Sequence, residues 1–165
     1  MRKLLVLFTI LLVVPATAYS RAPKPTQDGT LSVREGRGMV QLSAKGSVTG
    51  RFDRGKIVVT DPNPYDANRP VVYGASKTIY RGEKTTIYQG RNIRFRLGGA
   101  LFHIRLTGRG IFLSAVGHGR GLIDGTGNAQ AGIFYDGVWS LNDEPYHSLP
   151  DELTGFQLAA PPVSK

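Results

Sequence analysis

The feature that most constrains this chain is an alternating stretch from Asn92 to Thr107. Every second position is apolar, with one interruption at Gly98-Gly99. The apolar positions are Ile93, Phe95, Leu97, Phe102, Ile104 and Leu106. A period of two places neighbouring side chains on opposite faces of a β-strand. Two such runs joined by a Gly-Gly pair predict a β-hairpin, here with arginines on its outer face.

From residue 29 onward the chain repeats one pattern, in which short β-like runs are separated by glycine-containing turns. The longest irregular segment is Asp61 to Pro70, where three prolines cannot join a hydrogen-bonded ladder. No segment has clear helical periodicity. The sequence therefore predicts an all-β fold of short antiparallel strands in a sandwich or barrel.

One segment of the sequence recurs at a constant offset of 71 residues. Leu42-Ser43-Ala44, Gly46, Gly50 and Asp53 match Leu113-Ser114-Ala115, Gly117, Gly121 and Asp124. We interpret the match as two pseudo-repeated strand–turn–strand units, at about residues 30–61 and 101–128, facing each other in one domain.

The segment Gly119 to Asn128 is similar to turns of parallel β-helix pectinases and related glycoside hydrolases. The resemblance covers about ten residues and includes none of the active-site residues of those enzymes. It implies a small β-helix as the alternative fold, and it implies no activity.

The N-terminus has the order of a secretory signal peptide. A positive head is followed by an apolar run from Leu4 to Val14 and by Ala16-Thr17-Ala18, which predicts cleavage after residue 18. The alternative is a retained membrane anchor, but the run is short against the ~20 residues that span a bilayer. We therefore expect an exported protein, periplasmic, cell-surface or extracellular, with no transmembrane segment after cleavage. The chain has no cysteine, which excludes disulfides and thiolate metal sites and favours a bacterial origin.

The mature chain is predicted to have three parts: a flexible leader at 19–28, a single β domain at 29–141, and an acidic, Pro-rich tail at 142–165. Charge is distributed unevenly between them. Residues 19–124 hold 18 Lys/Arg against 7 Asp/Glu, whereas residues 125–165 hold one against five. A strongly basic body attracts polyanions. The acidic tail is also a candidate to fold over the basic face.

The candidate binding residues are arginines on or near the predicted hairpin. They are Arg94, Arg96, Arg105, Arg109 and Arg120. Guanidinium groups suit phosphate and carboxylate recognition. The expected partner is an anionic glycopolymer or a membrane surface, and export argues against nucleic acid. The leading hypothesis is a non-enzymatic binding or structural module; the alternative reading of the same arginines is ordinary solvation of a sheet face.

The second hypothesis is a small secreted hydrolase acting on carbohydrate or peptidoglycan, with Asp53 and Asp124 as acid and base. Both aspartates precede glycine-containing turns, where closing the turn is the simpler role. The three histidines, His103, His118 and His147, have no metal-ligand spacing, and no phosphate-loop or nucleophile-elbow pattern occurs. We expect no metal and no cofactor, and the sequence does not define an oligomeric state.

Overall fold

The computed structural model describes residues 27–126 and 136–159, so the predicted signal peptide and most of the leader lie outside the described residues. All regular structure in the described ranges is β-structure, as predicted. The strands are β1 (Gly29–Thr60), β2 (Val71–Arg81), β3 (Thr85–Gly125), β4 (Val138–Leu141), β5 (His147–Ser148) and β6 (Thr154–Leu158). The described ranges contain no helix that is long and apolar enough to cross a membrane.

The prediction of short strands is wrong for the two elements that build the molecule. β1 runs for 32 residues and β3 for 41, although both contain the glycines that suggested turns. Those glycines bend the strands without ending them. The Gly98-Gly99 pair, predicted as a hairpin turn, is one such bend inside β3, and the alternating residues on both sides of it are buried as predicted.

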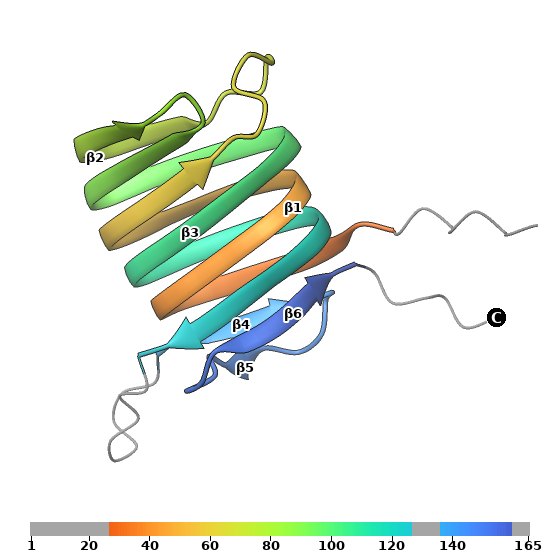
Figure 1. The fold of residues 1–165 in the computed structure, drawn as a ribbon. Coiled ribbons are helices and arrows are strands. Elements are labelled where there is room, and N and C mark those ends of the chain that lie inside the picture. The colour runs from red at the N-terminus through yellow and green to blue at the C-terminus, as the bar shows by residue number, and fades with distance from the viewer. Residues whose placement is uncertain (1–26, 127–135, 160–165) are drawn as a thin grey trace, which may run out of the picture.

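β1 and β3 form an antiparallel ribbon that winds into a coil, so that each turn of the ribbon hydrogen-bonds to the next (Figure 1). Gly38 of β1 pairs with both Gly108 and Gly125 of β3, and Ile57 pairs with both Tyr88 and Leu106. The two partners of one residue are thus 17 or 18 residues apart, which is one turn of the coil. The described strands form one antiparallel sheet that runs from β2 to β5 and does not close into a barrel.

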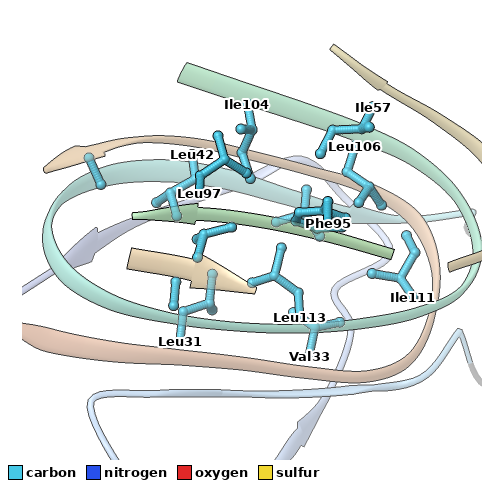
Figure 2. Close-up of a cluster of buried hydrophobic side chains, with 14 of the residues drawn as sticks. Leu31, Val33, Leu42, Ile57, Phe95, Leu97, Ile104, Leu106, Ile111 and Leu113 are labelled. Carbon is cyan, nitrogen blue, oxygen red and sulfur yellow. The ribbon is translucent and has the colours of Figure 1, made fainter. Parts of the chain in front are cut away.

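The coil is flattened, and its two walls enclose the core (Figure 2). The wall that we call the histidine wall comprises residues 39–45, 56–60, 101–107 and 118–124. The opposite wall, called the arginine wall, comprises residues 30–34, 47–52, 91–97 and 111–116. Alternate residues of both walls point inward, which is why a strict period of two in the sequence produces a closed apolar interior. Fully buried examples are Leu42, Ile104, Phe52 and Ile93.

The C-terminal part covers one end of the coil instead of crossing the surface as a tail (Figure 1). β4 pairs with residues 31–34 of β1, and β6 pairs with residues 119–123 of β3. Trp139 and Phe156 pack with ring centroids 5.7 Å apart, and Leu158 is buried beside them. Backbone hydrogen bonds from Arg37 N to Asp136 O and from Gly125 N to Pro150 O attach this cap to the coil.

The two segments that match in the sequence pair with each other in the coil. Gly46 lies opposite Gly117, and on either side of this glycine pair each leucine meets a glycine: Leu42 opposite Gly121, and Leu113 opposite Gly50. The matched segments therefore run antiparallel across one bend, and their aspartates extend in opposite directions from it.

Candidate functional site

One bend of the coil is built from stacked glycines. Going from strand to strand, the backbone partners at this bend are Gly125, Gly38, Gly108, Gly55 and Gly90. At Gly55, φ is +156°, and an added Cβ would lie 2.7 Å from the Gly108 Cα and against the Thr107 carbonyl oxygen. Real Cβ atoms do not approach backbone this closely, so the strands can stack at this bend only without side chains. We call this row of glycines the glycine edge.

An arginine stands beside each of the inner four glycines of this edge. Arg37 and Arg54 precede Gly38 and Gly55, while Arg91 and Arg109 follow Gly90 and Gly108. In the ladder Arg37 pairs with Arg109, Arg109 with Arg54, and Arg54 with Arg91. Neighbouring strands lie ~4.8 Å apart, so the four residues span about 14 Å along the coil axis. We call this row the arginine ladder.

Direct pairing of like charges across strands is unfavourable, by a few tenths of a kcal/mol to about 1 kcal/mol per pair. The arginine ladder contains three such pairs, and Arg51 opposite Arg94 on the arginine wall is a fourth. A chain selected only for stability would alternate the charges. The arrangement therefore points to an anionic ligand that is absent from the free protein.

Two openings lie along the arginine ladder. The larger, which we call the cationic hollow, has a volume of about 460 Å³ and contains four cationic side chains, Arg54, Lys56, Lys77 and Arg91. Ser76, Gln89 and Thr107 complete its polar lining, and no carboxylate contributes to it. The second opening, of about 430 Å³, is lined by Arg37, Arg54, Gly108 and Arg109. Because both include Arg54, they meet at the middle of the ladder.

The arginine wall adds a second row of cations beside the ladder. Arg51 lies over the Phe112 ring, with 4.0 Å from its guanidinium carbon to the ring centroid, and Arg34 lies over the Tyr146 ring at 4.3 Å. Stacking on a ring fixes a guanidinium plane while leaving its N–H edges available. A shallow groove of about 370 Å³ contains Arg34, Arg51 and Arg94 over this floor.

The structure separates the five arginines that were predicted as binding residues. Arg94 and Arg96 lie on the arginine wall, whereas Arg105 and Arg120 lie on the histidine wall. Arg109 belongs to the ladder. The hairpin interpretation placed Arg94, Arg96 and Arg105 on one face because it treated Gly98-Gly99 as a tight turn; a bend of the coil sends them to opposite walls.

Sequence reasoning missed Arg37, Arg54, Lys56 and Lys77. A signal for two of them was present: Arg-Gly at positions 37–38 and 54–55 recurs after 17 residues, and Gly-Arg at 90–91 and 108–109 after 18. These intervals equal one turn of the coil. Residues that recur at the period of a coil stack in a row, so the spacing alone predicts the ladder once the coil is known.

The two candidate catalytic aspartates are not brought together. Asp124 pairs with Met39 on the histidine wall, and Asp53 packs against Gly110 at the other side of the glycine edge. Three ladder steps separate their strands, about 14 Å, which exceeds the ~5–9.5 Å between paired glycosidase carboxylates.

The histidines make local contacts. The His103 Nδ1 lies 2.8 Å from the Ser43 hydroxyl, and the His118 Nδ1 lies 3.0 Å from the Asp28 carboxylate. His147 is exposed in the short strand β5. Within residues 27–126 and 136–159, no three His, Cys, Asp or Glu side chains gather as a metal site would require.

Two tyrosine pKa values are shifted near the β2 end of the coil. Partial burial raises the pKa of Tyr88, with a further contribution from Tyr80. A hydrogen bond from the Tyr65 hydroxyl to the Glu83 carboxylate, 2.8 Å long, raises the pKa of Tyr65. Both tyrosines therefore stay neutral over the physiological range and leave the positive charge of this end unchanged.

The acidic residues of the C-terminal segment lie in the cap and not over the ladder. Asp143, Glu144, Asp151 and Glu152 are exposed there, and none of them lines either opening along the ladder. Comparisons with protein-family models, curated proteins and solved structures found no match to this chain. The coiled ribbon and its arginine ladder are therefore the basis for assigning a function.

Proposed function

We propose that this protein is an exported, non-enzymatic module that binds a linear anionic polymer along the arginine ladder. The observation that carries the proposal is the row of Arg37, Arg109, Arg54 and Arg91, which keeps three like-charge pairs in contact. A polymer with regularly spaced negative groups would replace this repulsion with charge-assisted hydrogen bonds.

The shape of the row favours a linear polymer over a flat lipid surface. Four arginines in single file along a bend of the coil offer a narrow line of charge about 14 Å long. The arginine wall, with Arg34, Arg51 and Arg94, extends the positive surface to one side of this line. The order of charged and apolar residues at the N-terminus supports export, and in the bacterial envelope the abundant polymers of this kind are anionic glycopolymers.

We further infer that the segments around Gly46 and Gly117 are copies of one unit. Their antiparallel pairing about that bend, together with six identical positions at one offset, supports a local twofold relation. The same relation brings Arg54 opposite Arg109, at the centre of the ladder. A duplicated unit would thus have supplied the like-charge row directly.

Retention on a heparin column, eluted with a salt gradient, tests the proposal. The double variant Arg37→Glu/Arg109→Glu is compared with Arg105→Glu/Arg120→Glu, which changes the net charge equally but lies on the histidine wall. We expect the ladder variant to elute at much lower salt and the wall variant to stay near wild type. The salt dependence should correspond to release of about three or four counterions, and the ladder variant should lose about half of it.

Far-UV circular dichroism confirms that both variants are folded before the comparison is made. Equal loss of retention in the two variants would show that net charge alone causes binding, and would overturn the proposal.

A further inference from the structure

The cationic hollow differs from the rest of the ladder because three elements supply its charges. Arg54 and Lys56 come from β1, Lys77 from β2 and Arg91 from β3. Lys56 and Lys77 both pair with Gln89, one from each side, and Arg54 pairs with Arg91. The hollow therefore sits across the bend, at the end of the ladder farthest from the cap.

Irregularities in β2 and the glycine edge create this hollow. The register between β2 and β3 slips between Tyr73 and Ala75, and again between Ala75 and Lys77. Such bulges redirect side chains and commonly lie beside binding sites. Gly55 and Gly90 contribute no side chains to the floor, and a Cβ on Gly90 would lie 2.9 Å from the Ser76 nitrogen. Backbone therefore approaches backbone here, and the space in front of it stays open.

The charge of the hollow selects among anionic groups. Four cations and no carboxylate line it, so one carboxylate would neutralise only a quarter of its formal charge. A phosphate monoester carries about −1.5 to −2 charges and three acceptor oxygens in a compact group. Arginine forks and lysine ammonium groups are both suited to such oxygens. The volume of about 460 Å³ also leaves room for more than one oxyanion.

We propose that the cationic hollow binds a phosphate ester or a short chain of phosphates, which forms the end group of the polymer on the arginine ladder. This inference rests on the proposed function for the polymer but not for the hollow itself. Lys77 is the residue that separates the two, because it lines the hollow and is absent from the ladder, while Arg37 belongs to the ladder and is absent from the hollow.

Isothermal titration of the full chain with pyrophosphate, and with citrate as a carboxylate of comparable charge, tests the hollow. Pyrophosphate should bind at least tenfold more tightly than citrate. Lys77→Ala should weaken pyrophosphate binding about tenfold, the size expected for one charge-assisted hydrogen bond. Arg37→Glu should leave it within about twofold. Equal binding of citrate, or no effect of Lys77→Ala, would overturn the phosphate assignment even where heparin retention still depends on the ladder.

Long-chain polyphosphate distinguishes an end group from a free phosphate ester. If the hollow holds the end of a polymer on the ladder, Lys77→Ala and Arg37→Glu should each weaken polyphosphate binding. If only Lys77→Ala weakens it, the hollow binds phosphate independently, and the link to the ladder is overturned.

Discussion

Gly55 shows how much of this fold depends on single atoms that are missing. It lies at the glycine edge between Gly108 and Gly90, in a conformation with φ of +156° that residues with a Cβ rarely adopt. The strands on both sides approach it as closely as backbone permits. The same absence of side chains exposes the neighbouring arginines, so one residue type serves both packing and charge display.

Gly55→Ala should destabilise the protein by about 2–4 kcal/mol, because strain at this φ adds to an unavoidable contact with Gly108. Gly98→Ala is the matched control: its Cβ would meet only the Ser47 hydroxyl oxygen, at 3.8 Å. The control should change stability by less than about 0.5 kcal/mol. Urea denaturation measures both values. A similar, small effect of the two substitutions would contradict the close stacking at the edge.

At the scale of elements, the alternating pattern was informative and the glycines were ambiguous. The pattern of Ile93 to Leu106 correctly predicted which side chains are buried, because the period of two is a local property of any strand. Whether Gly98-Gly99 makes a hairpin or a bend is decided by pairing with β1, about 50 residues away, which no local signal reports. The candidate site failed for the same reason: the ladder joins Arg37 to Arg109 across that distance.

The arginine ladder should trade stability against binding. Arg54 has an arginine on both sides, so Arg54→Glu replaces two repulsive pairs with two attractive ones. We expect the free protein to gain about 0.5–1 kcal/mol at low ionic strength and the gain to fade as salt screens it. Thermal unfolding in low and high salt measures this gain.

The same Arg54→Glu variant should bind heparin more weakly, which gives the two measurements opposite signs. Arg105→Glu, an exposed change on the histidine wall, serves as the control for net charge. A loss of stability in Arg54→Glu together with unchanged binding would mean that the ladder is a structural feature.

At the scale of the molecule, the coil has one covered end and one open end. The cap of β4–β6 covers the apolar interior at one end, while β2 forms the edge at the other, beside the cationic hollow (Figure 1). Stacked β-structures require a terminal cover, because each turn buries its apolar side chains only against the next. The sequence suggested an acidic tail here because charged and proline residues dominate its composition, whereas three apolar side chains, Trp139, Phe156 and Leu158, determine its place.

Phe156→Ala should therefore destabilise the whole protein by about 3–4 kcal/mol, since the ring is 8% exposed and fills the space over Gly121. Leu153→Ala, on the same segment but 57% exposed, should change stability by less than about 0.5 kcal/mol. Below its lowered unfolding temperature, Phe156→Ala should still bind heparin like the wild type, because the cap contributes no residue to the ladder. Normal stability in Phe156→Ala would show that the coil does not need its cap, and lost binding in the folded variant would show that the cap belongs to the binding surface.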